Sequence, residues 1–212
     1  MIKDNFDKIR QKIAVAQGAR QVQLVAVSKK RSVEAIRELL AADQRQFGEN
    51  RVQEAEQKFP ALREVFADLE LHLIGPLQTN KVARAVELFD VIQTLDRPKL
   101  AEALAREMKA QGKYPRLFIE VNIGHEPQKA GVMPEDVPAF LTQCREMYGL
   151  SIEGLMAMPP FGQDPVPYFE KTKDLADKLA LTELSMGMSA DFEAAIKCGA
   201  SFIRVGTALF RS

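Results

Sequence analysis

The chain of 212 residues is long enough for one well-buried domain and short for two. Its 29 Lys and Arg residues balance its 29 Asp and Glu residues, which excludes the strong basic surplus of a dedicated nucleic-acid-binding protein. It has no long apolar run near its start and only two cysteines and two histidines, so we expect neither a membrane span nor a metal site. We therefore expect one cytoplasmic domain over residues 1–212 that binds a small ligand.

The apolar residues predict an alternation of helices and strands along the chain. Phe6, Ile9 and Ile13 lie at helical spacing, so an amphipathic helix over 5–16 is expected before the first strand. Eight short apolar runs then predict strands over 22–27, 45–48, 69–74, 91–94, 116–122, 152–156, 181–185 and 202–205. Helical patterns follow the first seven at 33–42, 50–59, 79–89, 98–111, from Pro134 onward, 167–179 and 189–198. Ser32 and Ser189 are the predicted N-caps of two of these helices.

Eight strands, each followed by a helix or helical turn, are typical of a (β/α)8 TIM-type barrel. We predict this α/β fold, with the helix over 5–16 as an extra N-terminal element. The alternative is an open, doubly wound sheet. It is disfavoured because Ser28, Lys29 and Lys30 follow the first strand in place of a glycine-rich phosphate-binding sequence.

Two lysines, Lys29 and Lys30, end the first predicted strand. Ligands bind at the carboxyl ends of the strands in parallel α/β folds, so a lysine at this place is a candidate for chemistry. Burial near an apolar barrel mouth lowers the pKa of a lysine amine, and a neutral amine forms a Schiff base with a carbonyl. A lysine in this position is more often a solvated turn residue. Strand alternation in the sequence does not separate Lys29 from Lys30.

The last two predicted strands end in small and hydroxyl-bearing residues. Ser189 follows the seventh strand, and Gly206 and Thr207 follow the eighth, where barrels of this type commonly bind phosphate. Arg204 lies inside the eighth apolar run, so its guanidinium needs a partner: a carboxylate, a phosphate or an acceptor on a bound ring. His72, between two leucines, is interpreted as a hydrogen-bonded core histidine rather than a catalytic one.

Seven stretches together resemble the pyridoxal phosphate homeostasis proteins, a single-domain family similar to the barrel domain of bacterial alanine racemase. They are AVSKK (26–30), FGENRVQE (47–54), HLIGPLQTNK (72–81), VNIG with its following KAG (121–131), GLMAM (154–158), LSMGMSADFEAAI (184–196) and IRVGTALF (203–210). The similarity extends over almost the whole chain. It implies a barrel that binds pyridoxal 5′-phosphate (PLP).

The resemblance also implies roles for particular residues. Lys29 is expected to carry PLP as an internal aldimine. The residues expected around this cofactor are Asn50 and Met156 beside the ring, Arg204 at the pyridine nitrogen or close to the phosphate, and Ser189, Gly206 and Thr207 at the phosphate.

These roles favour a carrier over an enzyme. An arginine donating to the pyridine nitrogen keeps that nitrogen unprotonated and makes the cofactor a poor electron sink. Cys144 and the three tyrosines, Tyr114, Tyr148 and Tyr168, do not fall at strand ends, so we expect no second base. The expected function is intracellular PLP homeostasis without robust turnover, by a monomer whose partners are PLP, free amino acids and PLP-dependent apoenzymes.

Two alternatives of other classes remain open. One is a small PLP-dependent racemase or decarboxylase. The other is a Schiff-base aldolase or phosphosugar barrel without a cofactor, which needs an acid–base carboxylate beside the lysine. Glu49 and Glu120 are the nearest carboxylates in the sequence for that role.

Overall fold

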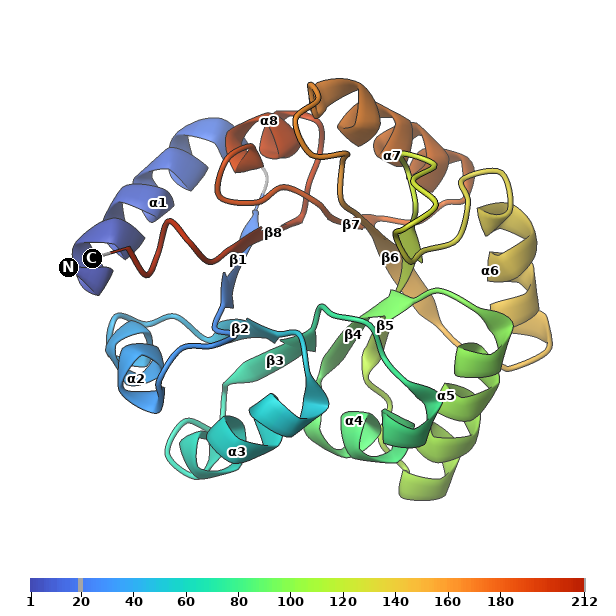
Figure 1. Cartoon of the computed structure of the whole chain (residues 1–212), viewed down its shortest axis with the longest axis horizontal. Coiled ribbons are helices and arrows are strands. Elements are labelled where there is room, and N and C mark those ends of the chain that lie inside the picture. Colours follow the sequence, from blue (N-terminus) through green and yellow to red (C-terminus); the bar gives the residue numbers. More distant parts are fainter. Residues whose placement is uncertain (19–20, 212) are drawn as a thin grey trace.

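The computed structural model describes residues 1–18 and 21–211. Eight parallel strands form a closed barrel in which neighbours follow sequence order and β8 pairs back with β1. The helices form a ring outside the strands (Figure 1). The predicted (β/α)8 barrel with an added N-terminal helix is confirmed.

The strands are β1 (Gln23–Val27), β2 (Gln46–Glu49), β3 (Glu70–Leu73), β4 (Val91–Leu95), β5 (Arg116–Val121), β6 (Ile152–Ala157), β7 (Glu183–Ser185) and β8 (Phe202–Val205). The helices are α1 (Ile2–Gln17), α2 (Val33–Ala41), α3 (Val52–Arg63), the 3₁₀ helix η1 (Thr79–Lys81), α4 (Val82–Leu88), α5 (Pro98–Gln111), α6 (Val137–Glu146), α7 (Val166–Lys178) and α8 (Phe192–Lys197).

The first predicted helix begins earlier, at Ile2, and the one over 79–89 divides into η1 and α4. Three more differ from the structure by three residues or more at one end. The helix α3 continues through Pro60 to Arg63, because Phe59 and Leu62 are both fully buried and hold this last turn against the core. The helix α6 begins at Val137, three residues after Pro134, because the chain first makes a turn in which the Asp136 N–H donates to the Met133 carbonyl. The third, α8, begins at Phe192 instead of following Ser189 directly.

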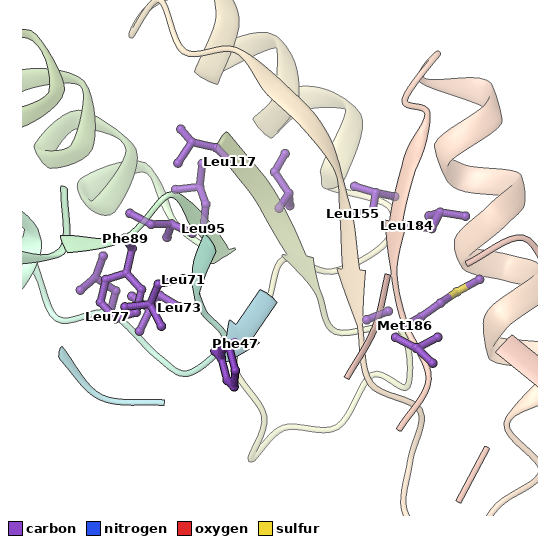
Figure 2. Packing of buried hydrophobic residues seen from close by; sticks show 14 of the residues in the cluster. Phe47, Leu71, Leu73, Leu77, Phe89, Leu95, Leu117, Leu155, Leu184 and Met186 are labelled. Atoms are coloured by element: carbon purple, nitrogen blue, oxygen red, sulfur yellow. The ribbon is translucent and has the colours of Figure 1, made fainter. Parts of the chain in front are cut away.

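The larger apolar core lies between the strands and the helices, and a smaller one fills the barrel. Figure 2 shows Leu155 and Leu184, register partners on β6 and β7, side by side in the larger core. The smaller cluster consists of Val25, Val91, Phe118, Met156 and Phe202. Side chains alternate across each strand, so this cluster identifies the faces of β1, β4, β5, β6 and β8 that point into the barrel.

The two ends of the chain lie together at one side of the barrel (Figure 1). The Asn5 side-chain amide donates to the carbonyls of Leu209 and Arg211, at 3.2 and 2.9 Å. Between α1 and α8, Lys12 forms an ion pair with Glu193. The N-terminal helix therefore covers the β8 side of the barrel. Within residues 1–18 and 21–211, no helix has both the length and the apolar character needed to cross a membrane.

Candidate functional site at the carboxyl ends of the strands

The geometry of β1 separates the two lysines that follow it. Val25 lies in the barrel interior, so Val27 and then Lys29 continue the same face. Lys30 turns away: its φ is 58°, and its backbone N–H donates to the Glu54 carboxylate on α3. Lys29 is exposed and lies in the turn two residues beyond the last residue of β1.

A buried polar cluster holds the turn that carries Lys29. We call Ser28, Glu49, Glu54 and Lys58 the lysine-turn cluster. The Ser28 hydroxyl donates to the Glu49 carboxylate at 2.7 Å. The Lys58 ammonium donates to the Ser28 carbonyl at 3.0 Å, to Glu49 at 3.1 Å and to Glu54 at 2.6 Å. Burial raises the pKa of Glu49, against the opposing effects of Ser28 and Lys58. Glu49 thus points outside the barrel toward α3, and the expectation that it could act beside the lysine is wrong.

The loops after β7 and β8 are tied together by Ser189. Its hydroxyl oxygen accepts a hydrogen bond from the Ala208 N–H at 3.3 Å. The prediction that Ser189 caps α8 is wrong, because Asp191 occupies the N-cap position and its carboxylate accepts from the Met188 N–H at 2.6 Å. Since the Ser189 oxygen serves as an acceptor, its O–H remains available as a donor.

Small residues at these two strand ends keep the loops close to the barrel. A Cβ at Gly206 would lie 3.1 Å from the Cβ of Val27, and one at Gly187 only 2.5 Å from the Cβ of Ala195. Gly187 also has a φ of 91°, which side-chain-bearing residues rarely adopt. Thr207, next to Gly206, is exposed. The structure therefore brings Ser189, Gly206 and Thr207 together at one side of the mouth.

Arg204 is 4% exposed and lies inside the barrel on β8. Its Nη1 donates to the Ser185 hydroxyl oxygen at 2.6 Å and its Nη2 to the Ala157 carbonyl at 3.1 Å. Burial lowers the pKa of Arg204 to about 10, and the nearby charges of Glu120 and Asp191 act in the opposite direction. The guanidinium is therefore still a cation at neutral pH, held by a hydroxyl and a carbonyl.

Glu120, on β5, is another buried ionisable residue, and its charge interacts with that of Arg204. It is 6% exposed. Burial, followed by the charge of Asp96, raises the pKa of Glu120 to about 7, while Arg204 acts to lower it. Its carboxyl can therefore hold or release a proton near neutral pH.

The two predicted ring-lining residues lie at different depths. Met156 is fully buried in the interior cluster, and Met158, two residues along the same strand direction, packs on this cluster while partly exposed. Met156 therefore forms part of the floor, and Met158 lies nearer to the mouth. Asn50 is half-buried and lines a cavity of about 790 Å³ between the loops after β2 and β3.

His72 is a buried, hydrogen-bonded histidine, as predicted. It contacts Glu70 and Gln93 through its two ring nitrogens. Sequence reasoning missed Gln93 and Ser185, which lie in the same interior network. The available signal was polar residues within otherwise apolar strands, which need buried partners.

The candidate second bases lie away from the mouth. Cys144 is buried on α6 among residues of the outer core, and burial raises the pKa of its thiol to about 12. Tyr114 and Tyr148 follow α5 and α6, in the loops that lead back to the amino ends of strands, and Tyr168 lies in α7. Both cysteines are free thiols.

Comparison with known proteins shows the family to which this barrel belongs. The family model for the alanine racemase N-terminal domain matches residues 1–212. The pyridoxal phosphate homeostasis protein of Aquifex aeolicus (strain VF5) is 40% identical over 202 residues, which cover 91% of this chain and 88% of that protein. The protein of the same name from Escherichia coli (strain K12) is 36% identical over 223 residues, 99% of this chain and 95% of that protein. The resemblance found in the sequence is confirmed.

Solved structures show the same similarity. PipY of Synechococcus elongatus PCC7942, solved with PLP bound, matches with a TM-score of 0.89 at 40% identity, and the match covers 100% of both chains. Alanine racemase of Clostridium difficile 630 matches with a TM-score of 0.75 at 14% identity, covering 99% of this chain and 57% of that one. The latter likeness extends to the fold alone.

Proposed function

The chain belongs to the family of the pyridoxal phosphate homeostasis proteins, and on this premise we propose that it binds PLP at the mouth of its barrel and serves PLP homeostasis. The observation that carries the proposal is that Lys29 follows β1 in the turn at its carboxyl end, while the buried Arg204 lies on the adjacent strand β8. The structure of PipY with PLP bound supports it. The donor set also fits the ligand: one amine, one guanidinium and a hydroxyl-lined loop pair match an aldehyde, a ring nitrogen and a phosphate.

Lys29 holds the cofactor covalently. Its Nζ would supply the amine that holds the aldehyde carbon of the cofactor, and the aldehyde oxygen would leave as water. The direction of the interior face of β1 supports Lys29 over Lys30, and the lysine-turn cluster behind it holds the turn in place. The fully buried Glu49 and the largely buried Lys58 restrict movement of this turn.

Ser189, Gly206 and Thr207 hold the phosphate. The free O–H of Ser189, the hydroxyl of Thr207 and the close approach of Gly206 to β1 support this role. Met156 and Asn50 would line the pocket of the ring, and Arg204 would donate to the pyridine nitrogen. An unprotonated pyridine nitrogen weakens the electron sink, so this arrangement favours a carrier without robust turnover. Its recipients are PLP-dependent apoenzymes in the cytoplasm, and the carrier is a monomer.

One observation favours a second candidate, a PLP-dependent racemase or decarboxylase. Such an enzyme needs a proton-transfer group besides Lys29, and Glu120, with its pKa of about 7 beside Arg204, is a suitable group. Proton–deuterium exchange at the α-carbon of L-alanine in heavy water distinguishes the two functions. A carrier exchanges far more slowly than about 1 per second, the low end of ordinary turnover. Faster exchange that is lost in Glu120→Gln would establish the enzyme.

Absorbance titration with PLP tests binding, with Lys30→Ala as the matched control for Lys29→Ala. We expect the visible absorbance of a protein-bound Schiff base in the wild type and in Lys30→Ala, and its loss in Lys29→Ala with an unchanged thermal transition. The Ser189→Ala, Thr207→Ala double variant should weaken PLP binding about thirtyfold or more and leave pyridoxal binding nearly unchanged. No absorbance in the wild type would contradict the proposed function, and equal losses for both ligands would contradict the phosphate assignment.

A further inference from the structure

A chain of hydrogen-bonded side chains runs through the barrel interior to Arg204. We call Glu70, His72, Gln93, Ser185 and Arg204 the interior chain. Arg204 Nη1 lies 2.6 Å from Ser185 Oγ, which lies 2.6 Å from Gln93 Oε1. Gln93 Nε2 lies 2.9 Å from His72 Nδ1, and His72 Nε2 lies 2.7 Å from Glu70 Oε1. All but Glu70 are buried, so each link forms away from competing water.

The interior chain has one orientation that satisfies every link. Burial lowers the pKa of His72 below its ordinary value, against the opposing effect of Glu70, so the ring is neutral and carries a single N–H. That N–H is at Nε2, because Glu70 can only accept. His72 Nδ1 must then accept from the Gln93 amide, and the Gln93 oxygen must accept from the Ser185 hydroxyl. Ser185 Oγ is thereby left to accept from Arg204.

The far end of the interior chain is anchored by charge. Glu70 also forms an ion pair with Arg116 at 2.9 Å. Burial alone would raise the pKa of Glu70, but the hydrogen bond from His72 and the charge and hydrogen bond of Arg116 lower it. Glu70 is therefore a carboxylate at neutral pH, and this fixes the proton of His72 on Nε2.

The interior chain can hold the orientation of the Arg204 guanidinium but is unsuited to conduct protons. Its middle link is the amide of Gln93, which does not readily accept a proton and release another. Each hydrogen bond of the interior chain instead fixes the orientation of the next side chain. Without Ser185, the Arg204 cation would be drawn to the negative charges of Glu120 and Asp191, which oppose the effect of burial on it.

We propose that Ser185, Gln93 and His72 are positioning residues that hold the Arg204 guanidinium in one plane at the mouth of the barrel. The Ala157 carbonyl supplies the second fixed contact, at 3.1 Å from Nη2. Two contacts to different nitrogens define the plane of a rigid guanidinium. The further consequence, that this plane keeps the pyridine nitrogen of PLP unprotonated, rests on the proposed function.

The first test uses the ligand-free protein and ¹⁵N NMR of the arginine side chains. In the wild type the Arg204 N–H protons should exchange slowly with solvent. In Ser185→Ala, and in Gln93→Leu one link further away, they should exchange about fivefold faster, because a hydrogen bond worth about 1 kcal/mol is lost or loosened. Ser185→Thr, which keeps the hydroxyl, should restore protection. The control Phe118→Leu removes packing from the same interior and should lower only the melting temperature.

The second test adds PLP labelled with ¹⁵N in the ring. The ring nitrogen signal should be that of an unprotonated pyridine in the wild type, in Ser185→Thr and in Phe118→Leu, and should move toward the protonated form in Ser185→Ala and Gln93→Leu. If the wild type binds no PLP, the proposed function fails while the ligand-free exchange rates still decide the positioning role. If PLP binds but the Arg204 exchange rates are unchanged in Ser185→Ala and Gln93→Leu, or change as much in Phe118→Leu, the positioning role is refuted.

Discussion

The interior chain ends at Arg204 and the lysine-turn cluster holds the turn of Lys29, and these two polar clusters are built differently. The interior chain has charges only at its ends, Glu70 and Arg204, and neutral groups between them, each hydrogen-bonded to the next. The lysine-turn cluster instead gathers Lys58, Glu49 and Glu54 around the backbone of the β1–α2 turn. The Oε2 of Glu49 is buried and has no hydrogen-bond partner among the residues that the structure describes.

The difference between neutral hydrogen-bonded groups and paired charges determines what each cluster can do. A network of directed neutral hydrogen bonds sets the orientation of a group with little net electrostatic cost. A cluster of buried charges binds strongly only while its ions remain paired, because each ion has lost its water. We therefore expect the interior chain to control the geometry of Arg204 and the lysine-turn cluster to control the stability of the turn that carries Lys29.

The largest expected effect comes from removing the cation of the lysine-turn cluster. Lys58→Met leaves the fully buried Glu49 without its ion-pair partner and should lower the free energy of unfolding by about 4 kcal/mol at pH 8. At pH 5 the loss should be smaller, because burial raises the pKa of Glu49 and so favours its protonated form, which needs no cation, as the pH falls. Urea denaturation measures both values. Lys173→Met, which breaks the more exposed pair with Asp177, is the control and should change stability by less than about 0.5 kcal/mol. A similar small change for Lys58→Met would show that the comparison is wrong.

Glu120 tests the interior by titration. Its folded pKa of about 7 is above the ordinary value of 4.5, so the native state binds more protons between these values and the stability due to Glu120 falls as pH rises through that window. Glu120→Gln removes this dependence. Relative to wild type, the variant should gain up to about 3 kcal/mol between pH 4.5 and pH 7.5, measured by denaturation at a series of pH values. Parallel profiles for the two proteins would mean that Glu120 is not perturbed by burial and Asp96.

A smaller effect is expected from breaking the interior chain at its histidine. His72→Phe leaves Gln93 and Glu70 each without one buried partner and should cost about 2 kcal/mol at pH 8. The lowered pKa of His72 means that the wild type loses stability as pH falls below 6.5, when the unfolded imidazole gains a proton. The gap to the variant should therefore narrow at pH 5. Gln111→Leu, at an exposed amide bonded to the Ala83 carbonyl, is the control, and an equal loss there would contradict a special role for the buried link.

Much of this fold could be predicted from the sequence because parallel barrel strands are buried on both faces. Such strands form short continuous apolar runs separated by amphipathic helices, and all eight runs became strands. The helix starts were less predictable. Ser189 has the sequence of a cap, but its oxygen accepts from Ala208, 19 residues later. A local pattern cannot distinguish a cap from a tie between two loops.

The site could be predicted only in part for a related reason. The residue types singled out the lysine pair Lys29 and Lys30 and the arginine Arg204 within its apolar run, and the family resemblance implied Lys29. The partners of Arg204 depend on which strands become neighbours and in what register. Ser185 precedes Arg204 by 19 residues and bonds Gln93, 92 residues earlier. The opposite directions of Glu49 and Glu120 likewise follow from strand alternation within a closed barrel, and are not contained in the residue types.

In the proposed site, PLP is held on Lys29 at the mouth of the barrel. Borohydride reduction of the PLP-loaded protein, followed by peptide mapping with mass spectrometry, tests it most directly, because reduction makes the link between the amine and the cofactor permanent. We expect one stoichiometric pyridoxyl adduct on Lys29 and none on Lys30. An adduct on Lys30, or equal labelling of several exposed lysines, would contradict it.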